Sequence, residues 1–196
     1  MARVRNIEID EVPADLRPVY QRFSEEYGPF LNQVRVFAHR PPALRHIMGL
    51  LLDLKDEALL PKRYLEIALV VVSKINECRY CVAHHTPRLV EQGLGAEAAE
   101  RILDKEVPGF DAVDMLVRDY AVQVTNNAPY MRDAIFDRLR QHFSEAQIVE
   151  LTLRTALCGF FNRFNDALQI GMEEGVIADM LAHGGREEAL PSHAAE

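Results

Sequence analysis

Two cysteines, a histidine and a glutamate have residue types and a spacing that suggest chemistry. Cys78 and Cys81 are three positions apart, His85 follows four positions later, and Glu66 stands twelve positions before Cys78. Outside the export pathway, a close cysteine pair is more typical of redox or metal chemistry than of a structural disulfide. Two thiols one helical turn apart can also close into a disulfide after modest side-chain rotation. We therefore predict dithiol redox chemistry at this pair.

The same spacing places Cys78, Cys81 and His85 on one face of a helix, because residues three and four positions apart are neighbours there. Asn76 fits the N-cap of this helix. Cys78 would then lie in the first turn, where the positive end of the helix dipole favours a thiolate. From the residues alone, Cys78 is thus the thiol expected to ionise more easily. The imidazole of His85 is close enough to Cys81 to accept or relay a thiol proton.

Glu66 can join this group only if the chain reverses direction. On one straight helix it would lie about 18 Å from Cys78, at a rise of about 1.5 Å per residue. A helical hairpin that turns near Asn76 would bring Glu66 level with His85. We predict this hairpin, with Glu66 orienting His85 and His85 serving the cysteines, which is a carboxylate–base–nucleophile order.

The rest of the chain is predicted to be helical, because the helical period runs through almost every segment and strand-like alternation is absent. We expect an all-α fold in a single domain over residues 1–196, with residues 183–196 frayed or disordered. The expected helices are 13–26, 30–39, 44–58, one from Pro61 that includes Glu66, one that carries His85 and closes at 93–95, then 96–103, 111–124, 131–143 and 144–171. Phe160 marks a point where a break in the last helix is expected.

A shift of 84 residues superimposes the central stretch on a second one that lacks its chemistry. The aligned pairs are Glu66 with Glu150, Arg79 with Arg163, Tyr80 with Phe164, Cys78 with Asn162, Cys81 with Asn165, and His85 with Gln169. We interpret this as an active unit near 59–94 and a degenerate repeat of the hairpin unit near 144–176. Chance similarity between two amphipathic helices is the alternative. We expect Asn162, Arg163 and Asn165 to be structural and to hydrogen-bond across the two units.

Composition and charge limit the partners and the compartment. Against 30 Asp and Glu residues there are 22 Lys and Arg residues, a formal net charge of −8, and the basic residues form no stripe. Nucleic acid is therefore not an expected partner. The first ten residues carry charges where a signal peptide needs an apolar core. Apolar runs such as 67–72 are too short to span a bilayer, so we expect a soluble cytoplasmic protein without a membrane partner.

The remaining cysteine and histidines have simpler expected roles. We expect Cys158 to be a small buried hydrophobic residue and His84 to face solvent or the edge of the core. His39, His46 and His142 have no partners at a meaningful spacing and are expected to be structural. A zinc site could combine Cys78, Cys81 and His85 with His84 or Glu66. Structural zinc sites usually take ligands from two separated clusters, and because the sequence lacks a second cluster we predict no metal.

The pattern Glu66-x11-Cys78-x2-Cys81-x3-His85 resembles the signature of the alkylhydroperoxidase D-like branch of the carboxymuconolactone decarboxylase superfamily. The resemblance is strong over residues 59–93 and looser over 150–169. It implies an all-α, oligomeric thiol peroxidase, commonly a trimer or hexamer, that needs no cofactor. The implied substrate is hydrogen peroxide or an alkyl peroxide, and the implied reductant is a protein or a small-molecule thiol.

The resemblance also implies roles for the four residues. Cys81 would be the peroxidatic cysteine, oxidised to a sulfenic acid, and Cys78 would resolve it as a disulfide. Glu66 and His85 would form the proton relay. This order differs from the helix-terminus argument, which makes Cys78 the more acidic thiol, so the sequence leaves open which cysteine attacks first.

Tyr80 departs from the pattern, because the family has a histidine just before the second cysteine. A phenol can donate a hydrogen bond to a peroxide oxygen but cannot act as a base near neutral pH, so we assign Tyr80 to substrate binding. Two other functions are weighed against peroxide reduction. Lactone decarboxylation, the activity that names the superfamily, needs acid–base groups and no dithiol. A redox-inert helical oligomerisation module would need none of the four residues.

Overall fold

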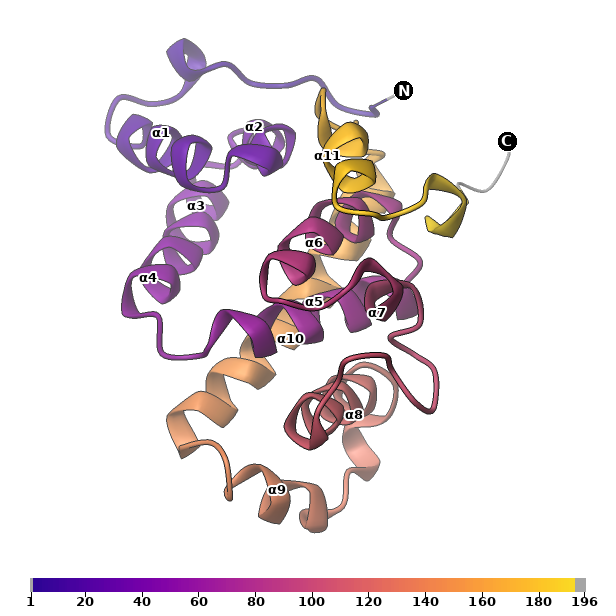
Figure 1. The fold of residues 1–196 in the computed structure, drawn as a ribbon. Coiled ribbons are helices and arrows are strands. Elements are labelled where there is room, and N and C mark those ends of the chain that lie inside the picture. Colours follow the sequence, from indigo (N-terminus) through magenta and orange to yellow (C-terminus); the bar gives the residue numbers. More distant parts are fainter. Residues whose placement is uncertain (1, 193–196) are drawn as a thin grey trace.

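The computed structural model describes residues 2–192, and within them every regular element is a helix (Figure 1). The all-α prediction is confirmed. The α-helices are α1 (Arg17–Glu26), α2 (Leu31–Phe37), α3 (Pro41–Ala43), α4 (Gly49–Glu57), α5 (Lys62–Ile75), α6 (Arg79–Glu91), α7 (Ala96–Glu100), α8 (Ala112–Asn127), α9 (Asp133–Leu139), α10 (Glu145–Leu168) and α11 (Val176–Ala182). Among these described helices, none is both long and apolar enough to cross a membrane.

Helix α5 lies at the centre of the molecule, packed against α6, α8 and α10 (Figure 1). Its residues Ile67 to Val72 are apolar, and all six are buried. A helix that is apolar on every side must be covered on every side, which explains why three helices surround it. The central position of α5 places its one carboxylate, Glu66, inside the protein.

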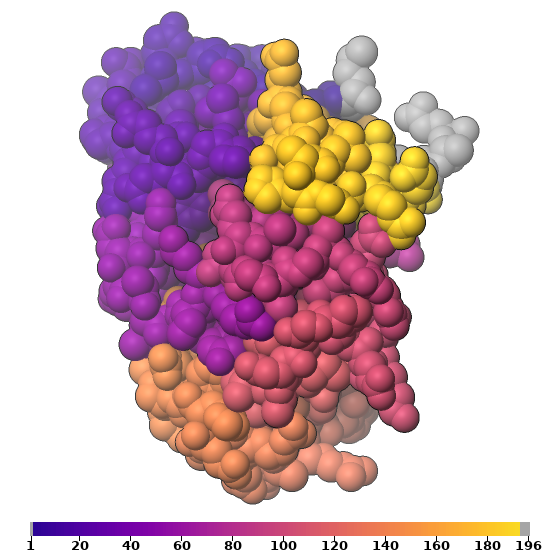
Figure 2. Space-filling model, viewed as in Figure 1, coloured from indigo at the N-terminus to yellow at the C-terminus, as the bar shows by residue number. Residues whose placement is uncertain are grey.

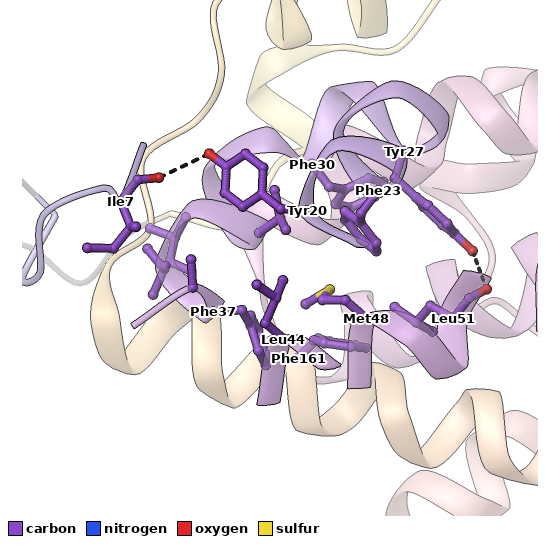
Figure 3. Packing of buried hydrophobic residues seen from close by; sticks show 14 of the residues in the cluster. Ile7, Tyr20, Phe23, Tyr27, Phe30, Phe37, Leu44, Met48, Leu51 and Phe161 are labelled. Carbon is purple, nitrogen blue, oxygen red and sulfur yellow. Dashed lines mark hydrogen bonds between the residues drawn. The ribbon is translucent and has the colours of Figure 1, made fainter. Parts of the chain in front are cut away.

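The N-terminal helices form a second layer with its own core (Figure 3). Phe23 and Tyr27 stack with ring centroids 4.5 Å apart, and the buried residues Leu44 and Met48 lie in the same cluster. The Tyr27 hydroxyl donates a hydrogen bond to the backbone oxygen of Leu51 over 3.0 Å. This cluster also includes Cys78 and Cys81, so the N-terminal layer covers the dithiol directly.

Two long helices begin where the sequence predicts. Asp111 caps α8 by accepting hydrogen bonds from the backbone N–H groups of Val113 and Asp114. Ser144 caps α10, with Gln147 as its capping-box partner. In each case a side-chain oxygen satisfies an N–H group that has no acceptor within its helix, so the start is encoded locally.

The stretch predicted to be a degenerate repeat differs from the α5–α6 hairpin, because α10 continues as one helix where a hairpin turn would fall. The break expected near Phe160 is absent, and that prediction was wrong. Gly159 lies close to α5 and has no left-handed backbone, so it serves packing rather than a turn. Without a turn, Asn162 and Asn165 stay on one helical face that is directed at α5 and α6.

The tail is better ordered than expected, at least to residue 192. Leu190 is buried against Val82 of α6 and Met180 of α11. The Lys74 ammonium donates a hydrogen bond to the backbone oxygen of Ala189 over 3.0 Å. The prediction of a frayed segment was therefore wrong for 183–192, because contacts with residues distant in the sequence hold this segment in place. The part of that prediction covering 193–196 lies outside the described residues.

Candidate active site

Helices α5 and α6 form the predicted hairpin. The turn between them places Glu77 in the left-handed region, with φ of 55°, and the Cys78 N–H donates a hydrogen bond to the backbone oxygen of Ser73 over 3.0 Å. Asn76 ends α5 instead of capping α6, so the predicted N-cap was wrong. Its side-chain amide donates to Asn162 Oδ1 over 2.9 Å, and it is therefore used for a contact between helices.

The start of α6 at Arg79 changes the expected positions of the two thiols relative to the end of the helix. Cys78 occupies the N-cap position of α6, and the helix itself begins at Arg79. Cys81 is then the third helical residue and lies in the first turn. The unpaired N–H groups and the positive end of the dipole stabilise negative charge within that turn. The electrostatic reason for preferring Cys78 therefore applies equally to Cys81.

Glu66 and His85 are brought into contact, as the hairpin predicts. His85 Nδ1 lies 2.8 Å from Glu66 Oε2, and both residues are buried. A carboxylate can only accept, so Nδ1 carries the shared proton and Nε2 of the neutral ring keeps its lone pair. Burial lowers the pKa of His85, while Glu66 opposes that shift. The ring is therefore held neutral and ready to accept a proton at ordinary pH.

All three cysteines are free thiols, and all are buried. The neighbouring Cys78 and burial raise the pKa of Cys81 well above its usual value. Cys81 therefore needs a base before it can act as a nucleophile. Cys81 and His85 are one turn apart on α6, and both line the same cleft. Cys78 is fully buried behind them and is not among the residues that line the cleft.

Asn165 hydrogen-bonds across the two aligned stretches, as predicted, and its partner is the Cys81 thiol. Its Nδ2 donates a hydrogen bond to Cys81 Sγ over 3.4 Å, and its Oδ1 accepts one from Gln33 Nε2 over 3.0 Å. Gln33 thus fixes which end of the amide faces the sulfur. Cys81 and Asn165 are aligned by the 84-residue shift, and that alignment was the signal in the sequence for this contact.

Cys158 is buried, as predicted, and it lies close to the other thiols. Its Sγ is 3.5 Å from Ser73 Oγ and 3.6 Å from the backbone oxygen of Leu69. Burial raises the pKa of Cys158 to about 12, so this thiol stays protonated and is a poor nucleophile.

A second histidine–glutamate pair lies beside the first. His84 is buried, so the expectation of a solvent-facing or core-edge position was wrong. Its Nε2 lies 2.8 Å from Glu173 Oε2 and 2.6 Å from the backbone oxygen of Pro29, and its Nδ1 lies 2.6 Å from the backbone oxygen of Tyr80. The tertiary fold brings Glu173 to α6 from a loop near the C-terminus, and no sequence spacing indicates that contact.

Tyr80 belongs to this second pair. Its hydroxyl donates a hydrogen bond to Glu173 Oε1 over 2.7 Å, and burial together with Glu173 raises its pKa well above the usual value. The side chain is not among the residues that line the cleft. A direct role of Tyr80 in substrate binding stays a prediction, and the bond to Glu173 offers an indirect role in holding the wall of the site.

The cleft has a volume of about 1070 Å³. It lies where the N-terminal layer meets α5, α6 and α10, and Figure 2 shows the surface hollowed between the N-terminal helices and α6. Glu66, Cys81 and His85 form part of its wall, and Glu150 and Arg154 of α10 line it as well. Its size admits an organic substrate as well as hydrogen peroxide. Within residues 2–192, no group of three or more His, Cys, Asp or Glu side chains is arranged to hold a metal ion.

Comparison with known proteins finds one matching family model and several similar folds. A model of the carboxymuconolactone decarboxylase family matches residues 41–112. The uncharacterized protein YnjA of Escherichia coli (strain K12) is 24% identical over 165 residues, which is 83% of this chain and 90% of that protein. Its length is therefore similar to that of this chain.

Three solved structures share the fold. An uncharacterized peroxidase-related protein from Silicibacter sp. TM1040 has a TM-score of 0.77 at 21% identity, covering 91% of this chain and 95% of that one. An uncharacterized peroxidase-related protein from Ralstonia eutropha JMP134, described as an alkylhydroperoxidase AhpD core, has a TM-score of 0.74 at 22% identity, covering 90% and 94%. A variant of the debrominase Bmp8 in complex with 2,3,4-tribromopyrrole has a TM-score of 0.73 at 18% identity, covering 91% and 96%.

Proposed function

We propose that this chain is a thiol-dependent peroxidase of the alkylhydroperoxidase D-like branch of the carboxymuconolactone decarboxylase superfamily, and that it reduces alkyl or hydrogen peroxides. One observation carries the proposal. A buried glutamate–histidine pair, with Glu66 Oε2 and His85 Nδ1 2.8 Å apart, lines the same cleft as the Cys81 thiol one helical turn away. This arrangement joins a base, its orienting carboxylate and a nucleophile.

In the first step, His85 Nε2 takes the proton of the Cys81 thiol. The thiolate sulfur attacks the outer peroxide oxygen, a sulfur–oxygen bond forms, and the oxygen–oxygen bond breaks. The leaving alkoxide takes the proton back from His85, so the products are an alcohol and a Cys81 sulfenic acid. Asn165 supports this step, because its hydrogen bond to the sulfur stabilises the thiolate.

In the second step, Cys78 attacks the sulfenic sulfur, a disulfide forms between Cys78 and Cys81, and water leaves. An external dithiol, from a protein or a small molecule, then reduces the disulfide and is itself oxidised to a disulfide. Access to the cleft supports this order. Cys81 lines the cleft, whereas Cys78 is fully buried behind it.

Three variants, each with one cysteine replaced, test the proposal with cumene hydroperoxide as substrate and dithiothreitol as reductant. We expect C81S to abolish consumption of the peroxide. Without dithiothreitol, we expect C78S to consume about one equivalent and to stop with a sulfenic acid on Cys81, trapped by dimedone and located by mass spectrometry. C158A removes the third buried thiol and should keep most of the wild-type rate. Peroxide consumption by C81S, or a sulfenic acid trapped on Cys78, would contradict the proposed order.

The same experiment separates the rival functions. A lactone enzyme would need neither thiol for its activity. A redox-inert oligomerisation module would consume no peroxide, whether as the wild type or as any of the variants. The oligomeric state that the family implies, a trimer or hexamer, stays a prediction that sedimentation can measure.

Reductive dehalogenation is a second candidate. Bmp8 is described as a debrominase, and the cleft of this chain has Phe30 and Phe161 in its wall, which suits an aromatic ring. In such a reaction, the Cys78–Cys81 dithiol would become a disulfide while carbon–bromine becomes carbon–hydrogen, with release of bromide and a proton. Incubation with 2,3,4-tribromopyrrole and dithiothreitol, with bromide measured by ion chromatography, tests this candidate, and no bromide above a protein-free control would exclude it.

A further inference from the structure

Arg154 of α10 is a buried arginine without a bonding partner. Its exposed fraction is 7%, and it lines the cleft. Within residues 2–192, no hydrogen bond or ion pair engages its guanidinium group. Arg118 is buried to the same extent, but it donates to the backbone oxygens of Ile102 and Asp104. Buried charges are normally paired, because an unpaired one is costly, so the free guanidinium of Arg154 indicates a ligand that is absent from the chain itself.

Glu150, one helical turn before Arg154, does not fill that role. Its Oε2 is buried and has no hydrogen-bond partner, and among the described residues no ion pair joins it to Arg154. Burial raises the pKa of Glu150, and the nearby positive charge of Arg154 opposes that shift. Glu150 therefore compensates the charge of Arg154 only partly. Lys62, which also lines the cleft, adds a second positive charge near this end.

Arg154 and Cys81 line the same cleft, and the contacts along α10 separate them along it. Cys158 lies against Leu69 of α5, and Asn165 contacts Cys81 of α6. From Arg154 to Asn165 the helix rises over 165 − 154 = 11 residues, or about 16 Å at about 1.5 Å per residue. The wall between them is largely apolar and includes Leu65, Leu69, Leu157 and Phe161.

From this arrangement we propose that Arg154 is an anion subsite that selects hydroperoxides carrying a carboxylate at the far end of an apolar chain. The peroxide half of this proposal rests on the proposed function, whereas the carboxylate half does not. A guanidinium binds a carboxylate through two parallel hydrogen bonds, and the apolar wall would hold the hydrocarbon between the two ends. The substrate class is thus a fatty-acid-like hydroperoxide.

A kinetic experiment compares the hydroperoxide of linoleic acid with the hydroperoxide of its methyl ester. We expect the wild type to have a KM about tenfold or more lower for the acid than for the ester. R154M should lose this preference because its KM for the acid rises while its KM for the ester stays the same. R154K should keep part of the preference. R163M, on the same helix but with an exposed arginine, is the matched control and should leave both KM values unchanged. The wild type alone can refute the proposal, because equal KM values for the acid and the ester would show that the carboxylate is not recognised.

A binding experiment separates this inference from the proposed function. Isothermal titration of the reduced wild type should detect binding of decanoate, weakened about tenfold or more in R154M and unchanged in R163M, with decanol much weaker than decanoate. Arg154-dependent binding of decanoate by a chain that reduces no peroxide would refute the peroxidase proposal and support the subsite. Peroxide reduction without Arg154-dependent binding of decanoate would refute the subsite and leave the peroxidase proposal intact.

Discussion

The Asn165 amide is held between Gln33 and Cys81, and its orientation follows from that chain of hydrogen bonds. Gln33 donates to Asn165 Oδ1 over 3.0 Å, which leaves Nδ2 to donate to Cys81 Sγ over 3.4 Å. A hydrogen-bond donor that faces a sulfur favours the thiolate. This effect lowers the pKa of Cys81, whereas Cys78 and burial raise it. At the scale of the residue, Asn165 therefore opposes the two effects that keep Cys81 protonated.

Replacing Asn165 by leucine should slow the first oxidation of Cys81 by roughly tenfold, because one hydrogen bond to a charged group contributes about 1.5–3 kcal/mol. Stopped-flow measurement of a single turnover with excess peroxide gives this rate separately from the reduction of the disulfide, which should change little. Q33A, which removes only the group that orients the amide, should have a smaller effect in the same direction. An unchanged first rate in N165L would show that Asn165 does not stabilise the thiolate.

At the scale of elements, one ion pair joins α5 to α8 and to the end of α6. Arg63 of α5 donates to both carboxylate oxygens of Asp114, over 2.8 and 2.5 Å, and to the backbone oxygen of Gln92. Asp114 is fully buried and also accepts from the backbone N–H of Asp111. The hairpin of α5 and α6 carries the four candidate site residues. The Arg63–Asp114 pair therefore holds this hairpin against α8.

Replacing Asp114 by alanine should lower the free energy of unfolding by roughly 2–3 kcal/mol, because it removes the charge-assisted hydrogen bonds to the partly buried Arg63. Urea denaturation followed by circular dichroism measures the change. D111A removes only the helix cap of α8 and should cost about 1 kcal/mol. A D114A loss no larger than that of D111A would mean that the pair contributes little beyond the cap.

At the scale of the whole molecule, the hairpin is covered from two sides by segments far from it in sequence. The N-terminal layer packs on the dithiol, and the C-terminal segment packs on the outer face of α6 (Figure 1). Leu190, buried against Val82, Ala83 and Met180, anchors the C-terminal cover. Glu173, which binds His84, precedes α11 in this same segment. The C-terminal cover is therefore expected to support the wall of the cleft.

Replacing Leu190 by alanine should lower the free energy of unfolding by roughly 2–3 kcal/mol, since a buried leucine is lost from a well-packed cluster. Chemical denaturation gives the size of the loss, and hydrogen exchange measured by mass spectrometry gives its place. Faster exchange should be concentrated in α11 and in the peptides that it covers on α6. L181A changes an exposed leucine of α11 and serves as the control, so equal losses in the two variants would count against an anchoring role.

Features that depend on neighbours along the chain could be predicted from the sequence. Helical periodicity predicted the all-α fold and the positions of α8 and α10, and the positions of Glu66 and His85 required the hairpin that the structure contains. The roles of the four residues in catalysis stay predictions, although their placement around one cleft is consistent with them. The Cys–Asn alignment of the repeat also held information about a contact, because Cys81 and Asn165 meet.

The remaining features became evident only in the folded structure, because they depend on which distant segments compete for the same groups. Asn76 has the residue type of a cap, yet Asn162 engages its amide. His84 has no partner nearby in sequence, and Glu173 reaches it across the fold. Arg154 is an ordinary helical arginine in the sequence, and only the packing of α10 on α5 buries it in the cleft without a partner among the described residues. Local patterns specify helices, whereas burial and pairing of charged groups are decided by packing between them.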